Sequence, residues 1–143
     1  MTSDFNLAVH AAVYLYHHDT ICTSRELAAS ICTNPVRVRR VLSRLKSAGL
    51  VAAKEGSGEG GYEFRGSGDT DLAAIARALN IRFTDSAWQS GLGNHECLIA
   101  SGMPGIMNSI YYDLNEECMK KLRTIHIRDI EETIFPEEKE NAK

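Results

Sequence analysis

Apolar residues recur with helical spacing along most of the chain, and the clearest pattern lies between Asn34 and Leu50. Its apolar positions follow one another at three- and four-residue intervals: Val38, Val41, Leu42 and Leu45. Asn34 is suited to cap the start of a helix, Pro35 to occupy its first position and Gly49 to end it. The stretch therefore predicts a helix with one face turned toward a hydrophobic core.

Further segments have the apolar spacing of helices: residues 5–17, 24–31, 71–79, 106–125 and 127–135. At the start of the second of these, Thr23 and Glu26 have the spacing of a capping box, in which each side chain accepts a hydrogen bond from the other residue's backbone N–H. Only Cys32 and Thr33 separate this segment from the helix that follows. The two segments together therefore predict a helix-turn-helix.

Two short β-prone runs, residues 50–54 and 62–65, flank a glycine-rich loop at residues 55–61. Glycine permits the tight backbone turns that a hairpin needs. A phosphate-binding P-loop is excluded, because no Gly-Lys-Ser/Thr follows the glycines and the next element is a strand. A hairpin behind a helix-turn-helix is a wing. The predicted fold class is mainly α with a small β-hairpin, a winged helix-turn-helix domain plus a long dimerisation helix.

The long helix is expected at residues 106–125, because apolar residues recur there with spacing close to that of a coiled-coil seam. The seam residues are Met107, Ile110, Tyr111, Leu114, Cys118, Leu122 and Ile125. Packing against the chain's own core would give the same spacing. We favour a dimer interface, because so short a chain offers little else for the helix to cover.

The chain has 143 residues, which suits one domain with an added dimerisation element. We expect the winged helix-turn-helix domain at residues 1–80 and an irregular effector or sensor region at residues 81–105, where Pro104 and several glycines occur. Residues 106–135 would form the dimerisation helix and the C-terminal helix. From residue 136 onward the sequence is charged and poor in apolar residues, which predicts a flexible tail over residues 136–143.

The formal net charge of −3 conceals an uneven distribution, because residues 1–68 carry +2 and residues 69–143 carry −5. No Asp or Glu lies between Leu27 and Lys54. The basic residues of that region are Arg37, Arg39, Arg40, Arg44 and Lys46. A helix that is apolar behind and arginine-rich in front suits the major groove of DNA, although a solvated basic face on a core helix would give the same pattern.

The sequence also lacks the features of several classes of protein. No apolar run approaches the roughly 20 residues that a membrane span requires. The first residues lack the basic stretch of a signal peptide, so we expect a cytoplasmic protein with no membrane partner. There is no nucleophile elbow, HExxH motif, dinucleotide fingerprint or paired carboxylates, so an enzyme is not expected. The four cysteines form no CxxC pair and do not predict a disulfide framework.

Short runs carry a more specific resemblance: residues 34–42 (Asn-Pro-Val-Arg-Val-Arg-Arg-Val-Leu), 45–51 (Leu-Lys-Ser-Ala-Gly-Leu-Val), 60–62 (Gly-Gly-Tyr) and 72–79 (Leu-Ala-Ala-Ile-Ala-Arg-Ala-Leu). With these runs the chain resembles the Rrf2 family of bacterial winged-helix transcription regulators, strongly over residues 5–80 and loosely over residues 95–135. The resemblance implies a homodimer joined by a long helix. It also implies a recognition helix in the major groove, a wing at the minor groove, and action mostly as a repressor.

The expected partner is double-stranded DNA that carries a two-fold symmetric operator. Contacts are expected from the helix-turn-helix and the wing, at Ser24, Thr33, Asn34, Pro35, Val36, Arg37, Arg40, Arg44, Lys54, Gly60, Gly61 and Tyr62. Arg37 and Arg40 lie in the first two turns of the recognition helix, where base edges are usually reached. Lys54, at the base of the wing, is expected to contact phosphate.

Many Rrf2 proteins hold an iron–sulfur cluster through three closely spaced cysteines before the dimerisation helix, whereas this chain has only Cys97 there. A cluster needs several thiolate ligands. The neighbouring His95 and Glu96 do not complete the spacing of a zinc or cluster motif. No cofactor or metal is therefore expected. The chain resembles the cluster-free members, in which a thiol or a small molecule is the signal.

Cys32 and Cys97 are the candidates for redox sensing. Cys32 precedes a helix N-terminus, where the helix dipole and nearby arginines favour the reactive thiolate. Cys97 lies in the expected effector region, where a flexible segment could bring it to Cys32 as a disulfide partner. The alternatives are that Cys32 packs under the turn and that Cys97 is a small loop residue.

Other interpretations stay open. Cys22 and Cys118 are expected to be packed rather than reactive. A small-molecule ligand bound near Trp88 could control the same DNA-binding fold. A third possibility is a protein-interaction adaptor that uses a winged helix without DNA.

Overall fold

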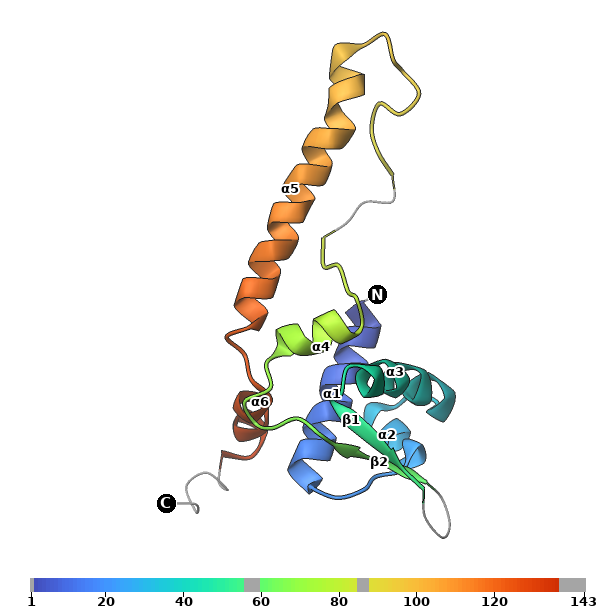
Figure 1. The fold of residues 1–143 in the computed structure, drawn as a ribbon, viewed down its shortest axis with the longest axis vertical. Coiled ribbons are helices and arrows are strands. Elements are labelled where there is room, and N and C mark those ends of the chain that lie inside the picture. Colours follow the sequence, from blue (N-terminus) through green and yellow to red (C-terminus); the bar gives the residue numbers. More distant parts are fainter. Residues whose placement is uncertain (1, 56–59, 85–87, 137–143) are drawn as a thin grey trace. The chain divides into compact units, whose positions relative to one another are not determined.

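The computed structural model of the chain describes residues 2–55, 60–84 and 88–136. It forms two compact units, one made of residues 1–81 with residues 122–143 and the other of residues 82–121. The described residues contain six helices and one two-stranded antiparallel sheet, which confirms the predicted fold class (Figure 1). The expected turn of the glycine-rich loop, at residues 56–59, lies outside the described residues. None of the described helices is long and apolar enough to cross a membrane.

Helix α1 (Thr2–His18) lies at the centre of the first unit, in contact with α2 (Ser24–Ile31), α3 (Pro35–Ser47), α4 (Leu72–Ala78) and α6 (Ile127–Ile134). Its buried positions combine small and large apolar residues: Leu7, Ala8, Ala11, Ala12, Val13 and Leu15. Alanine lets neighbouring helices approach closely, while the leucines fill the space between them. The single core of this unit therefore surrounds α1.

The ends of the helices follow from local side chains. In α2 the capping box is present, since Thr23 Oγ1 accepts a hydrogen bond from Glu26 N at 3.1 Å and a Glu26 carboxylate oxygen accepts one from Thr23 N at 3.4 Å. In α3, Asn34 Oδ1 accepts a hydrogen bond from Arg37 N at 2.8 Å, and Pro35 occupies the first helical position. These contacts fix where the two helices of the helix-turn-helix begin.

Strands β1 (Val51–Lys54) and β2 (Gly61–Phe64) pair in register from Val51 opposite Phe64 to Lys54 opposite Gly61. Tyr62 also pairs with Cys22, through hydrogen bonds of 2.8 and 2.9 Å between their backbone groups. A Cβ atom at Gly61 would lie 2.9 Å from the carbonyl oxygen of Cys22. Glycine at position 61 is therefore required for the segment before α2 to pack against the hairpin.

The C-terminal helix α6 belongs to the same unit as the winged helix, whereas the sequence analysis grouped it with the dimerisation helix. Ile127 is fully buried, and its backbone N–H donates to Thr70 O at 2.9 Å. The backbone N–H of Leu72 donates in return to Ile125 O at 2.9 Å. The expected grouping followed the order of the sequence, while this pairing joins segments that are far apart in it.

In the second unit, α5 (Leu98–Leu122) begins eight residues before the Ile106 expected from the sequence. Gly102, Pro104 and Gly105 favour an irregular segment, yet Pro104 lies inside the helix. Pro104 is the seventh residue of α5, so it lacks the N–H that would donate to the carbonyl oxygen of residue 100, and the helix continues despite the loss of that bond. Local propensity was therefore a poor guide to where this long helix starts.

Asn115 of α5 binds the backbone of residues 83 and 84, which precede this helix in the sequence. Asn115 Oδ1 accepts hydrogen bonds from the backbone N–H groups of Phe83 (2.8 Å) and Thr84 (2.9 Å). Asn115 Nδ2 donates to Thr84 O at 2.8 Å, and Thr84 Oγ1 donates to Tyr111 O at 3.1 Å. These bonds give residues 83–84 the backbone partners that a strand would otherwise supply.

The burial of α6 gives a test of the fold. We expect Ile127→Ala to lower the free energy of unfolding by about 2–4 kcal/mol, because it leaves a cavity in a packed core. Ile134→Ala is the matched control on the same helix, where the side chain is 58% exposed, and it should cost less than about 1 kcal/mol. Urea denaturation measures both values. Equal losses for the two variants would contradict the placement of α6.

Candidate nucleic-acid interface

The exposed side of α3 carries a row of four residues opposite its buried stripe: Val36, Arg40, Ser43 and Ser47, which we call the α3 ridge. Their intervals of four, three and four residues place them on one face of a helix. Val36 is 67% exposed, which is unusual for a branched apolar side chain at the start of a polar face. The ridge thus combines one apolar and several hydrogen-bonding side chains on a solvent-facing helix.

Arg37 lies on the flank of α3 that faces α1, and its side chain is engaged within the protein. Its guanidinium donates to Asp4 Oδ1 from Nη2 at 3.1 Å and from Nε at 3.4 Å, and Nη2 also donates to Ser3 Oγ at 2.8 Å. Arg40 Nη2 lies 3.5 Å from the same Asp4 oxygen but is 64% exposed. The structure therefore separates two arginines that the sequence analysis treated alike: Arg37 joins α3 to α1, and Arg40 faces solvent.

Arg44 also has a partner within the protein. Its Nη1 donates to the carbonyl oxygen of Leu79, the C-cap of α4, at 3.1 Å. A positive charge is favourable at a helix C-terminus, where carbonyl groups lack helical partners. Arg44 thus links α3 to α4 rather than lying on the α3 ridge.

A polar cavity of about 380 Å³ lies beside α3, where the start of α2 and the hairpin meet. We call it the basic cavity; it is lined by Thr23, Ser24, Arg25, Arg39, Ala53, Lys54, Glu55, Gly60, Gly61 and Tyr62. Arg39 Nη1 donates to Ser24 Oγ at 3.2 Å, which orients the guanidinium toward α2. The cavity brings together the expected residues Ser24, Lys54, Gly60, Gly61 and Tyr62.

Arg25 and Arg39 also line the basic cavity, although the sequence analysis did not select them. The sequence contained information that could have identified both residues. The capping box places Arg25 at the N-terminus of α2, and Arg39 is adjacent in sequence to Arg40 of the α3 ridge. The sequence could not predict that Arg25 and Arg39 line the same cavity as Lys54, because this depends on how the hairpin packs against the helices. Lys54 is itself partly neutralised, since its Nζ lies 3.5 Å from Glu63 Oε1.

The two cysteines proposed for redox sensing, Cys32 and Cys97, both lie next to helix ends. Cys32 is the C-cap of α2, with a left-handed backbone (φ 63°), and its Sγ donates to Ala29 O at 3.8 Å. It therefore lies at the carbonyl end of α2, which disfavours a thiolate, and two residues before Asn34, the N-cap of α3, as the sequence predicted. Cys97 is the residue at a helix N-terminus, because its Sγ accepts a hydrogen bond from Ala100 N at 3.5 Å at the start of α5.

The other cysteines are less accessible. Cys22 is buried, and burial raises the pKa of its thiol, with the nearby Glu26 carboxylate raising it further. A raised pKa keeps the group as an unreactive thiol at neutral pH. Cys118 is half-buried on α5. These positions agree with packing roles for both residues.

The expected dimer residues divide between the two units. Leu122 and Ile125 pack against the core of the first unit. On α5, Met107, Tyr111 and Cys118 are half-buried, while Ile110 and Leu114 are exposed. No described residue of α5 is fully buried in the single chain. The single chain therefore covers part of the expected seam and leaves Ile110 and Leu114 exposed.

Solved structures of transcriptional regulators have the same fold. A putative transcriptional regulator from Lactobacillus plantarum aligns over 100% of both chains, with a TM-score of 0.79 and 23% identity. IscR from T. potens aligns over 89% of this chain and 82% of its own, with a TM-score of 0.62 and 18% identity. CymR, the global cysteine regulator of B. subtilis, aligns over 91% and 94%, with a TM-score of 0.64 and 14% identity. At these identities the likeness establishes the fold alone.

The sequence itself matches one family model, Rrf2, described as an iron-dependent transcriptional regulator, over residues 1–133. No curated protein is significantly similar in sequence. The family description raises the question of whether the residues of this chain fit iron. Among the described residues, no group of three or more His, Cys, Asp or Glu side chains could hold a metal ion. Residues 82–105 contain Cys97 as their single cysteine, so the donors do not fit an iron site within one chain.

The match covers nearly the whole chain, and the helix-turn-helix and the hairpin have the form that the resemblance implied. Because members of the family are transcriptional regulators, the expectation that the chain is not an enzyme is confirmed. The chain belongs to the Rrf2 family and is a DNA-binding transcriptional regulator.

Proposed function

We propose that this chain is a homodimeric repressor that binds a two-fold symmetric operator in double-stranded DNA. The observation that carries the proposal is the position of the α3 ridge next to the basic cavity with Arg25, Arg39 and Lys54. Regulators of this kind need side chains that reach base edges and cations that position the protein on phosphates. The ridge and the cavity supply these two kinds of group side by side.

Base reading falls to the α3 ridge. Arg40 is mostly exposed and can make a bidentate contact with guanine, while the exposed methyl groups of Val36 suit the methyl group of thymine. Asn34 and Pro35 define the N-terminus of α3, which enters the groove first in helix-turn-helix proteins. In this proposal Arg37 and Arg44 hold the helix at its angle through Asp4 and the Leu79 carbonyl.

Phosphate binding falls to the basic cavity. Arg39, Arg25 and Lys54 contribute positive charge, and the N-terminus of α2 adds the positive end of a helix dipole. Arg39 is positioned before DNA arrives, because Ser24 accepts a hydrogen bond from it. Gly61 lets the hairpin approach the segment before α2, and Gly60 lies so close to Lys54 that a Cβ atom there would be 3.0 Å from the Lys54 carbonyl oxygen.

Substitution of two arginines tests this division, with operator fragments first selected from a genomic pool. Arg39→Ala should weaken binding to operator and random DNA by similar factors and reduce the slope of log K against log salt by about 1, because a phosphate contact carries no sequence information. Arg40→Ala should cost about 1–3 kcal/mol on the operator and little on random DNA. Fluorescence anisotropy at several salt concentrations measures both.

Arg77→Ala is the matched control, because it removes the same charge from an exposed position on α4. The operator affinity and the salt slope of Arg77→Ala should both stay close to those of the wild type, because Arg77 lies outside the α3 ridge and does not line the basic cavity. If Arg39→Ala and Arg40→Ala both bind like the wild type, the α3 ridge and the basic cavity are not the DNA interface. A winged-helix adaptor that binds protein would then be the better explanation.

The dimer is proposed from the apolar surface of α5. Ile106, Ile110 and Leu114 follow at intervals of four residues and are 57%, 44% and 45% exposed in the single chain. Exposed apolar rows of this kind on a long helix are typical of an interface between proteins. A two-fold dimer carries two copies of α3, and a two-fold symmetric operator offers one half-site to each copy.

Charges on this row should separate the protomers. We expect Ile110→Asp combined with Leu114→Asp to yield a monomer in sedimentation equilibrium, because carboxylates would be desolvated in an apolar interface. Both residues lie outside the core of the first unit, so the circular dichroism of the helices should be retained. Tyr112→Asp adds a charge to the opposite side of α5, where the Tyr112 side chain is 63% exposed, and this variant should remain a dimer. A dimer that persists in the double variant would refute this interface.

Control by thiol oxidation remains part of the proposal, with the roles of the cysteines reversed. Cys97 at the N-terminus of α5 is exposed and is the better nucleophile. Its thiolate would attack a hydroperoxide, break the O–O bond and become a sulfenic acid as the alcohol or water leaves. A second thiol, such as the exposed Cys32, would then form a disulfide and release water.

The two cysteines can be distinguished by their order of reaction. With hydrogen peroxide and a dimedone probe, Cys32→Ser should still form a sulfenic acid at Cys97, whereas Cys97→Ser should show little labelling. Mass spectrometry of the labelled peptide makes the assignment. Oxidised wild type should also lose operator affinity and recover it with dithiothreitol. If oxidation leaves DNA binding unchanged, the signal is not a thiol.

A further inference from the structure

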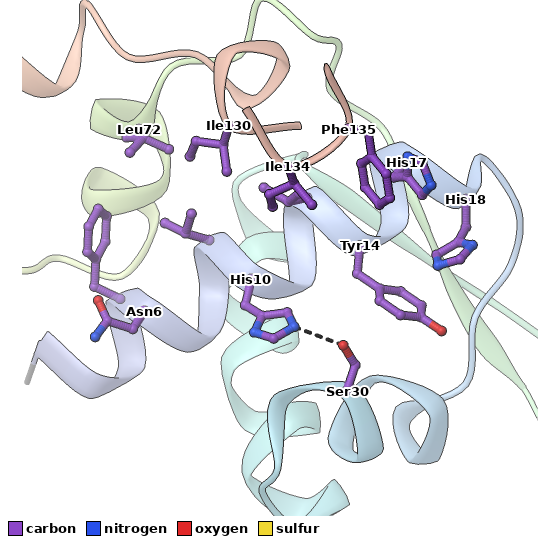
Figure 2. A pocket seen from close by; sticks show the side chains of 13 residues that line it. Asn6, His10, Tyr14, His17, His18, Ser30, Leu72, Ile130, Ile134 and Phe135 are labelled. Carbon is purple, nitrogen blue, oxygen red and sulfur yellow. Dashed lines mark hydrogen bonds between the residues drawn. The ribbon is translucent and has the colours of Figure 1, made fainter. Parts of the chain in front are cut away.

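A second cavity, of about 520 Å³, lies in the first unit on the side of α1 that faces α2 and α6 (Figure 2). Its volume falls within the range of small-molecule sites in proteins. Val9 and Val13 of α1, Leu72 at the start of α4, and Ile130, Ile134 and Phe135 in or just after α6 form an apolar wall. We call it the histidine cavity, because the other part of its lining contains three of the five histidines of the chain.

The polar groups gather toward α2 and the end of α1. His10 Nε2 lies 2.9 Å from Ser30 Oγ, across the space between α1 and α2. The Tyr14 and His18 rings lie beside each other with centroids 4.2 Å apart, and Figure 2 shows the Tyr14 hydroxyl on the same side as Ser30. His17 stacks on Phe135 with centroids 3.8 Å apart, and its Nδ1 lies 3.1 Å from Glu131 Oε1. Apolar and polar lining are therefore separated within one cavity.

The charge of the lining narrows the class of ligand. Among the described residues that line the cavity there is no Asp, Glu, Lys or Arg, and the ionisable groups are imidazoles and one phenol. Burial raises the pKa of Tyr14, with Cys22 and Glu26 adding to the shift, so its hydroxyl remains a hydrogen-bond donor. Imidazole N–H and phenol O–H groups donate to an anionic oxygen more strongly than to a neutral one. The apolar wall favours a hydrocarbon or aromatic body.

The histidine cavity is a better candidate than the one next to Trp88, where the sequence analysis placed a ligand. That second-unit cavity measures about 260 Å³, and Met107 and Tyr111 line it. These two residues belong to the seam that the proposed dimer would cover. The histidine cavity lies instead between helices of the first unit, the DNA-binding unit, which contains the helix-turn-helix and the hairpin.

From this arrangement we propose that the histidine cavity is an effector site for a small carboxylic acid with an apolar body. The ligand carboxylate would accept hydrogen bonds from the side chains of His10, Tyr14 and His18. The apolar part of the ligand would lie against α6. Ser30 of α2 forms part of the wall, and the opposite end of α2 contributes Ser24 and Arg25 to the basic cavity. A ligand that shifts α2 therefore alters the groups proposed to hold phosphate. This effector role rests on the DNA-binding function, whereas binding to the cavity does not.

Calorimetry without DNA tests the site. The probes are 4-phenylbutyrate and decanoate, and 4-phenylbutanamide is the neutral match for the first. Both acids should bind once per chain, and the amide at least about tenfold more weakly, because hydrogen bonds to a charged group contribute more. His18→Gln, at an exposed position, should remove most of the preference for the acid over the amide. His95→Gln, outside the cavity, should leave it intact.

A second variant blocks the apolar wall. Ile134→Trp should abolish binding of all probes, and urea denaturation should show an unchanged fold because Ile134 is 58% exposed. No binding by either acid, equal affinity for acid and amide, or normal binding by Ile134→Trp would overturn the site. A fourth outcome would also overturn the site: the wild type binds no probe, and the Ile134→Trp substitution converts a dimer into a monomer. A second copy of the chain would then cover the cavity.

The effector role has its own readout. A saturating concentration of 4-phenylbutyrate should change the affinity of the wild type for DNA, and DNA should change the affinity for the acid by the same factor. The amide at equal concentration and the Ile134→Trp variant should show no such change. An acid that binds in calorimetry but leaves DNA affinity unchanged would refute the effector role. Absence of all DNA binding would instead contradict the proposed function.

Discussion

The burial of α1 is the constraint on which the rest of the DNA-binding unit depends. Each other helix of the unit and strand β2 contact it, and its alanines allow these elements to approach closely. Polar groups at its two ends then set the direction of its neighbours. Asp4 near the N-terminus holds Arg37 of α3, and His17 near the C-terminus contacts Glu131 of α6. One helix thus determines both the angle of the recognition helix and the position of the C-terminal helix.

The arginines of α3 show how one basic sequence serves two purposes. Arg37 and Arg44 flank the helix on the side of the protein body, where a carboxylate and a helix C-terminus accept their hydrogen bonds. Arg39 and Arg40 remain toward solvent, one beside the hairpin and one on the α3 ridge. The partly buried pairs stabilise the position of α3 more than exposed ion pairs do. Rigid placement of a reading helix is a condition for discriminating between base edges.

Features with local causes could be predicted from the sequence, and features with distant causes could not. The ends of α2 and α3 follow from Thr23, Glu26, Asn34 and Pro35, all within a few residues of the helices that they cap. The pairing of Arg37 with Asp4 joins residues 33 positions apart, and periodicity does not reveal such partners. The start of α5 was missed for another reason: Pro104 and its neighbouring glycines have unfavourable propensities, which the longer helix overrides. In the same way, the basic cavity and the histidine cavity exist only once several segments have packed together.

The return of α6 into the core makes the DNA-binding unit discontinuous along the chain, and this has a consequence for biosynthesis. A ribosome releases the helix-turn-helix and the hairpin first, but the partners of Thr70 and Leu72 are Ile127 and Ile125. Until those residues emerge, α1 exposes the apolar surface that α6 later covers. The whole of α5 is synthesised in this interval. A nascent chain therefore acquires the helix proposed to join two copies before its DNA-binding unit is complete.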